Sequence, residues 1–233
     1  MKGLLPTYAI ILSLVIVVAL GGSRAVTVVT ENLGVTPGHT VILDAGHGGI
    51  DGGATSVNGA LESRINLEIT CRLKDLLHLL GIQTIMVRED DRSIHTEGSS
   101  IAEKKISDLK NRVKIVNSTD HAVLVSIHQN YFSDGKYSGA QVFYNNSDGS
   151  MELAKCLQDA FVRSLNSGSK RLSEPANGIY LMQHTHCTGV LVECGFLSNY
   201  REEALLRNEA YQKNICCVIA ATLSNYLYNE TAS

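Results

Sequence analysis

Residues 41–49 read VILDAGHGG, a run of aliphatic residues that leads into a glycine-rich segment with a histidine. Two later runs have the same form, AVLVSIHQN at residues 122–130 and GVLVECGF at residues 189–196. Short apolar runs rich in β-branched residues and ended by Gly or Asn are typical of fully buried strands. In open α/β sheets, ligands bind where such strands end. The three runs therefore predict a sheet whose exit edge carries two histidines and a glutamate.

The segments between these runs favour helices. Residues 63–80 repeat apolar side chains at helical spacing and are followed by Gly81, a residue common just past a helix end. The same patterns predict further helices at 106–117 and 151–165, one or two helices at 201–227, and further strands at 82–87 and 139–144. Strands that alternate with helices of this length predict a single α/β domain of three layers, with a mostly parallel central sheet and helices on both faces.

Size and charge limit the classes of function. After an apolar N-terminus, about 200 of the 233 residues remain for folding, which suits one medium-sized domain. The formal net charge is −3, so the chain has no excess of basic side chains with which to hold nucleic acid by bulk electrostatics. We therefore expect no nucleic-acid partner.

The N-terminal region has the composition of a targeting segment. Residues 4–20 are almost wholly apolar and are flanked by a lysine and by small residues, as in a secretory signal peptide. The run also approaches the roughly 20 residues that span a bilayer. We expect export, with residues 1–25 acting as a signal peptide or a membrane anchor. Residues 26–40 are expected to form a linker or an edge strand before the catalytic domain at 41–233.

His47 lies among five glycines within the eight residues 46–53, which allow the backbone to turn sharply and to approach a ligand. The segment lacks the Lys-Ser/Thr ending of a phosphate-binding loop. We therefore interpret His47 as a metal ligand, and we expect Asp44 to accept a hydrogen bond that orients its ring.

Three further positions complete a candidate site. Glu62 opens the helix predicted at 63–80, where the helix dipole favours a carboxylate even without a ligand. Together, His47, Glu62 and His128 offer two imidazoles and one carboxylate, a donor set that suits Zn²⁺ with an open position for water. Glu193 follows an apolar run, and a carboxylate there must be paired, coordinated or raised in pKa. Glu193 therefore fits a general base.

Five motifs, spread in order over residues 41–227, resemble the catalytic domain of the zinc-dependent N-acetylmuramoyl-L-alanine amidases, the type 3 amidase family. These motifs are LDAGHGG at 43–49 with Asp51, Glu62 with Asn66 and Leu67, Leu109 and Arg112 with Asn117, SIHQN at 126–130, and VECGFLSN at 192–199. The resemblance implies a phosphorylase/hydrolase-like fold. It also implies a metal on His47, Glu62 and His128, with Glu193 as the catalytic glutamate. The implied reaction is hydrolysis of the amide between muramic acid and the L-alanine of the peptidoglycan stem peptide.

Within this family, the small size and the apolar N-terminus are similar to the sporulation and germination amidases of the CwlD type. That similarity implies removal of stem peptides from spore-cortex muropeptides, so that muramic-δ-lactam can form. The implied place is outside the cytoplasm, in a secreted or membrane-anchored form that faces the cell wall or the forespore intermembrane space. Besides peptidoglycan, we expect an accessory envelope protein as a partner, because the chain has no wall-binding repeats of its own.

Other positions allow two interpretations. Asn130, Arg64 and Asn199 could bind substrate carbonyls or brace the glutamates, but turn or helix-cap roles fit equally well. Residues 88–105 are expected to be a loop over the site or a solvated face, and residues 176–181 to line the substrate groove. Two other functions stay open: a zinc exopeptidase that acts on free peptides, and an inactive wall-binding scaffold.

Overall fold

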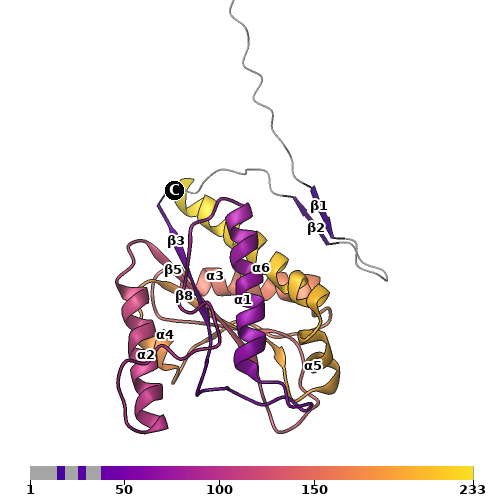
Figure 1. Cartoon of the computed structure of the whole chain (residues 1–233). Helices are drawn as coiled ribbons and strands as arrows, with labels where there is room; N and C mark the ends of the chain where they lie inside the picture. Colours follow the sequence, from indigo (N-terminus) through magenta and orange to yellow (C-terminus); the bar gives the residue numbers. More distant parts are fainter. Residues whose placement is uncertain (1–14, 19–25, 30–37, 233) are drawn as a thin grey trace, which may run out of the picture.

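The computed structural model describes residues 15–18, 26–29 and 38–232. A six-stranded sheet forms its centre, with the strand order β4-β3-β5-β8-β6-β7 (Figure 1). The strands are β3 (Thr40–Ala45), β4 (Thr84–Met86), β5 (Ala122–Asn130), β6 (Gln141–Tyr144), β7 (Glu174–Pro175) and β8 (Thr188–Phe196). β3 pairs in parallel with β4 and β5, and β5 pairs in parallel with β8. β6 runs antiparallel to β8 and parallel to β7, so the sheet is mostly parallel, as predicted.

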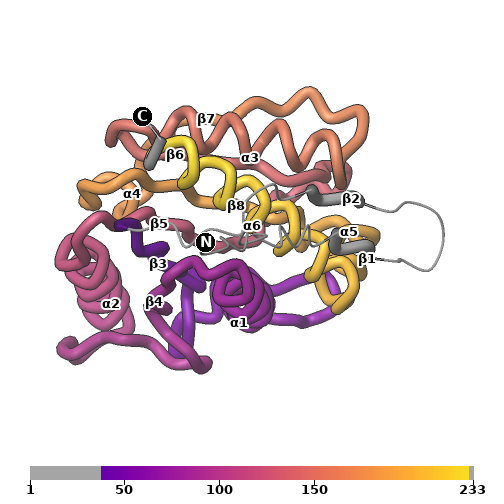
Figure 2. The backbone as a smooth tube through the Cα atoms, turned by 90° about the horizontal axis from the view of Figure 1, so that it is seen from above, coloured from indigo at the N-terminus to yellow at the C-terminus, as the bar shows by residue number. Residues whose placement is uncertain are grey.

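Helices cover both faces of this sheet (Figure 2). They are α1 (Glu62–Leu79), α2 (Ile101–Asn117), α3 (Ser150–Ser164), α4 (Tyr180–His184), α5 (Tyr200–Leu206) and α6 (Glu209–Ala232). α1, α3 and α6 lie over one face, whereas α2 and α4 lie over the other. The predicted three-layer α/β domain is therefore confirmed.

The central strands β3, β5 and β8 are mainly apolar because both faces of the sheet are buried there. Side chains alternate between the two faces along a strand. In β3, Val41 and Leu43 belong to the core cluster under α1, α3 and α6, whereas Ile42 belongs to the smaller cluster under α2 and α4. All three side chains have no exposed surface. Most polar residues of these strands therefore lie near their carboxyl ends, and the buried Ser126 within β5 is paired with Asp44 of β3.

The N-terminal region is described only in part. β1 (Val15–Val18) pairs antiparallel with β2 (Val26–Val29). β2 falls within the predicted linker or edge strand at 26–40, but it pairs with β1 and not with the six-stranded sheet. Apart from β1, the predicted signal peptide or membrane anchor at 1–25 lies outside the described residues. Within the described part of the chain, no helix is both long enough and apolar enough to cross a membrane.

Two helix boundaries differ from the predictions. α2 begins at Ile101 and not at 106, because the Ser100 side chain accepts from the Glu103 N–H while the Glu103 carboxylate accepts from the Ser100 N–H. This reciprocal capping box satisfies two N–H groups at the helix start. Residues 201–227 form two helices, one of the two predicted alternatives, but the second helix ends at Ala232 and not at 227. The Asn208 side chain accepts from the Tyr211 N–H at the start of this second helix.

Replacing Ser100 by Ala should lower the free energy of unfolding by about 1 kcal/mol, because the Glu103 N–H then loses its side-chain acceptor. Urea titration followed by circular dichroism would measure the loss. The control is Ser100→Thr, which keeps a hydroxyl oxygen in the cap and should stay close to the parent chain. Equal stability of the Ala and Thr variants would contradict a role for this cap.

Candidate metal centre

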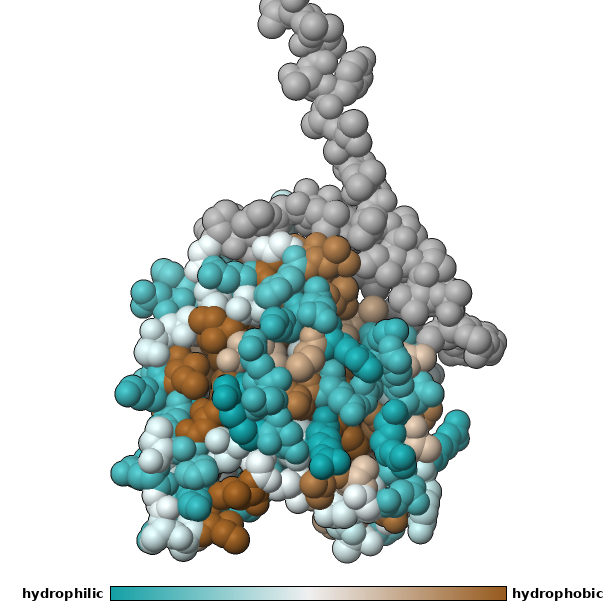
Figure 3. Space-filling model, in the orientation of Figure 1, coloured by the Kyte–Doolittle hydropathy of each residue, from teal (hydrophilic) through white to brown (hydrophobic). Residues whose placement is uncertain are grey.

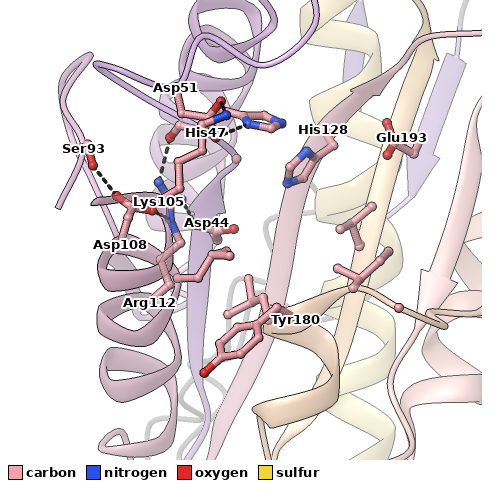
Figure 4. A pocket seen from close by; sticks show the side chains of 16 residues that line it. Asp44, His47, Asp51, Ser93, Lys105, Asp108, Arg112, His128, Tyr180 and Glu193 are labelled. Carbon is pink, nitrogen blue, oxygen red and sulfur yellow. Dashed lines mark hydrogen bonds and ion pairs between the residues drawn. The ribbon is translucent and has the colours of Figure 1, made fainter. Parts of the chain in front are cut away.

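Three elements bring the predicted ligands together at one edge of the sheet. His47 lies just after β3, His128 lies near the end of β5, and Glu62 is the first residue of α1. Within the described residues these three side chains form a group whose ligand atoms all lie within 4.8 Å of one another. His128 and Glu193 are direct neighbours in the parallel register of β5 and β8. Figure 4 shows Glu193 beyond His128, on the side away from His47.

The Glu62 carboxylate is the centre of this group. Its Oε1 lies 3.0 Å from His128 Nδ1 and 3.3 Å from His47 Nε2. Oε1 also accepts from the Gln129 N–H at 3.2 Å, and Oε2 accepts from the Ala54 N–H at 2.9 Å. Burial would raise the pKa of Glu62, but the hydrogen bonds and charges of the two histidines outweigh it and hold the pKa far below its usual range. Glu62 is therefore ionised, as a metal ligand must be.

Asp51, and not Asp44 as predicted, orients His47. His47 Nδ1 lies 2.9 Å from Asp51 Oδ2, which leaves Nε2 to face Glu62. Lys105 Nζ holds the other Asp51 oxygen at 2.8 Å. His47 also has a φ of 62°, a left-handed conformation that is uncommon for residues other than glycine. Such local strain is found where the surroundings impose it, often at functional sites.

Two glycines make room for the imidazoles. A Cβ atom on Gly46 would lie 2.1 Å from Nε2 of His128, so the ring can occupy its place only because residue 46 has no side chain. A Cβ atom on Gly53 would lie 2.6 Å from Oε2 of Glu62 and 2.8 Å from Cδ2 of His47. The glycine-rich sequence therefore allows the backbone to pass directly beside the ligands.

These donors fit a tetrahedral zinc site. With metal–ligand bonds of 2.0–2.2 Å, ligand atoms at the corners of a tetrahedron are roughly 3.3 Å apart. The two spacings from Glu62 Oε1, 3.0 Å to His128 and 3.3 Å to His47, match this separation. The two imidazole rings meet edge to face, with centroids 5.0 Å apart. Two nitrogens and one carboxylate also form a set that suits Zn²⁺.

Asp44 has a different role from the predicted one. Its carboxylate accepts from the Arg112 guanidinium and, at 2.6 Å, from the Ser126 hydroxyl. Burial would raise the pKa of Asp44, but the charge and hydrogen bond of Arg112 oppose it. Together with the Ser126 hydrogen bond and the charge of His128, they outweigh burial and lower the pKa. Arg112 Nη2 in turn donates to the His47 carbonyl at 2.7 Å. Asp44 thus positions Arg112, and Arg112 holds the backbone carbonyl of His47. Asp44 forms no hydrogen bond with the His47 ring.

Residues 88–100 form no helix or strand, in line with the loop predicted at 88–105, but Arg88 does not belong to a solvated face. Its side chain is only 1% exposed. The guanidinium donates to the carbonyls of Ala45 at 2.8 Å, Gly46 at 3.0 Å and Ser63 at 2.8 Å. Buried carbonyls need such partners because no water reaches them. Arg88 therefore joins the glycine-rich loop to the first turn of α1.

Glu193 differs from Glu62 in its contacts. Its Oε2 is buried and has no hydrogen-bond partner among the described residues. Burial raises the pKa of Glu193 to about 7; the nearby charge of Glu62 acts in the same direction, and that of His128 opposes it. A carboxylate with a pKa near neutrality can accept a proton and return it. Glu193 is therefore a candidate proton carrier.

The site opens into a cleft with a volume of about 410 Å³ between α2 and α4. Its walls include Lys105 and Arg112 from α2, and Gly178–Leu181, which confirms the predicted groove lining at 176–181 in part. In the space-filling view the lower edge of the molecule is indented between the parts that carry α2 and α5 (Figure 3). β3 and β5 end at this edge (Figure 1).

The three predicted substrate-binding residues lie outside the residues that line this cleft. Arg64 is exposed on α1, with its Nε 3.6 Å from Asp91 Oδ2. Asn130 is the last residue of β5 and accepts, through its carbonyl, from the Leu197 N–H at 2.8 Å. Asn199 caps α5 by accepting from the backbone N–H groups of residues 201 and 202. Substrate contact stays a prediction for all three.

Sequence reasoning missed Lys105, Arg88 and the orienting role of Asp51. A signal existed only for Asp51, which lies four residues after His47 in the glycine-rich segment. Lys105 and Arg88 stand in a polar segment where nothing in the local pattern distinguishes a buried or bridging side chain from a solvated one.

Zinc affinity of the metal-free chain should rise with pH. Burial lowers the pKa of His47, but the Asp51 and Glu62 carboxylates outweigh it and raise the pKa to about 9. Because zinc displaces this proton, affinity should increase about tenfold per pH unit until pH approaches that pKa. Calorimetry at pH 7 in two buffers of different ionisation enthalpy would count the released proton.

The matched variant for this test is Asp51→Asn, which removes the hydrogen bond that most strongly raises the pKa of His47. It should release fewer protons at pH 7 and bind zinc about 10- to 100-fold more weakly, as is typical when an orienting partner is lost. A flat affinity between pH 7 and pH 9 in the parent chain would contradict the assignment of His47.

Gly46→Ala should reduce zinc content, because its Cβ atom and the His128 ring cannot occupy the same space. Elemental analysis of dialysed protein would give zinc per chain. Gly168→Ala is the control for the replacement of a glycine as such: the φ of 90° strains any side chain there, but a Cβ atom meets nothing within 4 Å, so the folded variant should keep its zinc. Full zinc content in Gly46→Ala would contradict the position of the His128 ring beside Gly46.

Known proteins provide an independent comparison. Residues 41–225 match the family described as N-acetylmuramoyl-L-alanine amidase. The germination-specific N-acetylmuramoyl-L-alanine amidase of Bacillus subtilis is 38% identical over 191 residues, which cover 81% of this chain and 80% of the relative. Because the match extends over most of the folded chain, it concerns the whole domain and not a single motif.

Solved structures agree with this result. The CwlD amidase from Clostridioides difficile, in complex with the GerS lipoprotein, is 41% identical with a TM-score of 0.77, and the match covers 82% of this chain and 98% of that one. The catalytic domain of CwlV, an amidase from Bacillus (Paenibacillus) polymyxa, is 26% identical with a TM-score of 0.70, again over 82% of this chain and 98% of that one. In sequence and in fold, the chain therefore belongs to the N-acetylmuramoyl-L-alanine amidase family.

Proposed function

We propose that the chain is a zinc-dependent amidase that hydrolyses the bond between the lactyl group of muramic acid and the first L-alanine of the peptidoglycan stem peptide. The observation that carries this proposal is the meeting of three ligand side chains beside a buried glutamate that has no partner, at the edge of an open cleft. Family membership over residues 41–225 supports the choice of bond.

His47, Glu62 and His128 are the residues that would hold the zinc. When bound there, zinc supplies a Lewis acid that polarises the amide carbonyl and lowers the pKa of a water molecule to about 7. The protein keeps the ligands in place without the metal: Asp51 directs Nε2 of His47 inward, and the Gln129 N–H fixes the carboxylate of Glu62. Such preorganised ligands need little rearrangement during the reaction.

Glu193 is proposed to carry the proton. With a pKa of about 7, its carboxylate can take a proton from the attacking water and donate it to the leaving nitrogen. The second transfer is needed because an amide nitrogen leaves poorly unless it is protonated. Glu193 and His128 are paired in the register of β5 and β8, so the proposed proton carrier and this ligand lie on the same face of the sheet.

Asn130, Arg64 and Asn199 are proposed to act at the rim of the groove, as contacts to substrate carbonyls or as braces. The position of Asn130, two residues beyond His128 at the end of β5, supports the first role for that residue. The helix cap and the hydrogen bond that Asn199 Nδ2 donates to the Gly135 carbonyl favour a bracing role there.

We further propose that the substrate is spore-cortex peptidoglycan and that the product leads to muramic-δ-lactam. The relative from Bacillus subtilis is named as germination-specific, and the CwlD structure from Clostridioides difficile contains the GerS lipoprotein. These two names support a role in germination and an accessory envelope protein as partner. An enzyme with this substrate acts outside the cytoplasm, facing the cell wall or the forespore intermembrane space.

The N-terminal region has a proposed role in this export. Residues 1–25 would act as a signal peptide or membrane anchor and residues 26–40 as a linker, followed by the catalytic domain at 41–233. The apolar run at residues 4–20 supports the first assignment.

Glu193→Gln should abolish hydrolysis while leaving zinc content unchanged, because the amide keeps the shape of the side chain but cannot accept the proton. Purified peptidoglycan would be digested with and without added zinc, and the products identified by mass spectrometry. The parent chain should release intact stem peptides from muramic acid only when zinc is present. The expected loss is at least about 100-fold, the lower end for removal of general acid–base catalysis.

Free stem peptides that lack muramic acid serve as the control substrate. Their cleavage would favour the zinc exopeptidase over the amidase, whereas zinc binding without any product would favour the inactive scaffold. Persistent hydrolysis by Glu193→Gln would exclude Glu193 as the proton carrier.

A further inference from the structure

β6 borders the site on the side away from the metal ligands. Gln141 of β6 is the register partner of Glu193 in the antiparallel pair of β6 and β8. Directly opposed residues in such a pair point to the same face of the sheet. Gln141 therefore lies on the face that carries Glu193 and His128. Along this edge the order is His128 on β5, Glu193 on β8 and Gln141 on β6.

Gln141 links this strand to Arg171, a residue of the segment before β7. The Gln141 side chain is only 3% exposed. Its Nε2 donates to the Leu172 carbonyl at 2.6 Å, and its Oε1 accepts from Arg171 Nη1 at 3.3 Å. Arg171 is thus hydrogen-bonded to the side chain of Gln141, the residue that is paired with Glu193 in the sheet.

An irregularity in β8 provides a second support for Arg171. Between the pairs His128–Glu193 and Asn130–Phe196, β8 has one residue more than β5. An extra residue in a strand re-aims the side chains that follow it. Phe196 is thereby brought to the face of Glu193, and the Arg171 guanidinium lies over its ring, 5.1 Å from the centroid. A guanidinium over an aromatic face is held by cation–π attraction.

Arg171 forms no salt bridge within 4 Å among the described residues, although its charge acts on the Glu202 carboxylate and opposes the rise in pKa that burial causes there. Its two hydrogen bonds go to neutral acceptors, Gln141 Oε1 and the Ser138 carbonyl, and both are 3.3 Å long. By contrast, Arg112 is paired with two buried carboxylates. A guanidinium has five N–H donors in a planar fork that fits a carboxylate. Arg171 is partly exposed and keeps donors for such a ligand.

The direction of the substrate follows from the proposed reaction. The carbonyl of the scissile amide belongs at the metal ligands, and the leaving nitrogen belongs at Glu193, which protonates it. The stem peptide begins at that nitrogen, so it extends from Glu193 away from His128. Gln141 and Arg171 lie on this side. Stem peptides carry free carboxylates, which are the anions that a guanidinium fork binds best.

We propose that Arg171, held by Phe196 and Gln141, binds a carboxylate of the stem peptide and makes the enzyme selective for peptides whose carboxyl groups are not amidated. This inference rests on the proposed function, because the amidase reaction gives the direction of the peptide. Arg171 is a binding residue here and takes no part in proton transfer.

Binding of the released peptide tests the inference without catalysis. Calorimetry on the zinc-loaded full chain would compare a stem tripeptide with free carboxylates against the same tripeptide with every carboxyl group amidated. The parent chain should bind the acidic form about tenfold more tightly, in line with one charge-assisted hydrogen bond. Arg171→Gln should bind the acidic form about tenfold more weakly than the parent chain and should no longer distinguish the two forms.

Arg171→Lys keeps the charge but loses the fork, and it should retain only part of the selectivity. Lys136→Gln is the matched control: Lys136 lies by the ring of Tyr137 in the same aromatic cluster, but it is already paired with Asp134 at 2.6 Å. This variant should keep the full tenfold ratio. On muropeptides, Arg171→Gln should raise KM for acidic stems about tenfold with little change in kcat and unchanged zinc content.

The inference would be overturned by equal selectivity in Arg171→Gln and the parent chain, by equal binding of both peptide forms to the parent chain, or by binding of neither. A parent chain that hydrolyses no muropeptide would count against the proposed function, whereas the binding ratios would still decide whether Arg171 recognises a carboxylate.

Discussion

The parallel pairing of β3, β5 and β8 is the constraint on which the site depends. Because the three strands run in the same direction, their polar ends meet at one edge of the sheet. A nine-residue strand such as β5 is roughly 30 Å long, so a reversed strand would carry its histidine to the far side of the domain. The side chains packed on both faces fix this register, since a shift of one residue turns every side chain of a strand to the opposite face and would separate His128 from the face of Glu193.

Two buried arginines then determine the shape of the ligand loop. Arg88 and Arg112 are 1% and 2% exposed, and together they donate to the carbonyls of residues 45, 46 and 47. Three successive carbonyls are thus held from two sides, and His47 can keep its left-handed φ of 62°. A lysine could not replace either residue, because a point charge lacks the fork that reaches several acceptors. The strain at His47 is therefore balanced by contacts that come from the loop after β4 and from α2.

The sequence predicted the features that depend on local pattern and on strand ends. Apolar runs that end in polar residues predict the three-layer domain and the helix that begins at Glu62. They also predict that His47, Glu62 and His128 meet. The sequence could not distinguish Asp44 from Asp51 as the partner of His47, because that choice depends on how the loop folds back. The early start of α2 was readable, since Ser100 and Glu103 have capping-box spacing. The antiparallel β6 was not, because strand direction is set by tertiary connections.

Two glutamates at the same edge acquire opposite properties from their contacts. Glu62 accepts from backbone N–H groups and lies between two imidazoles, so its pKa falls and it stays a carboxylate. Glu193 has a buried oxygen with no partner, so its pKa rises to about 7. Titratable pairs whose environments separate their pKa values divide acid–base roles between them. The division needs no difference in residue type. The Ala54 N–H just after the glycine-rich loop and the Gln129 N–H from β5 both reach the Glu62 carboxylate, whereas no donor among the described residues reaches Glu193 Oε2. Glu62 is therefore suited to hold a cation and Glu193 to move a proton.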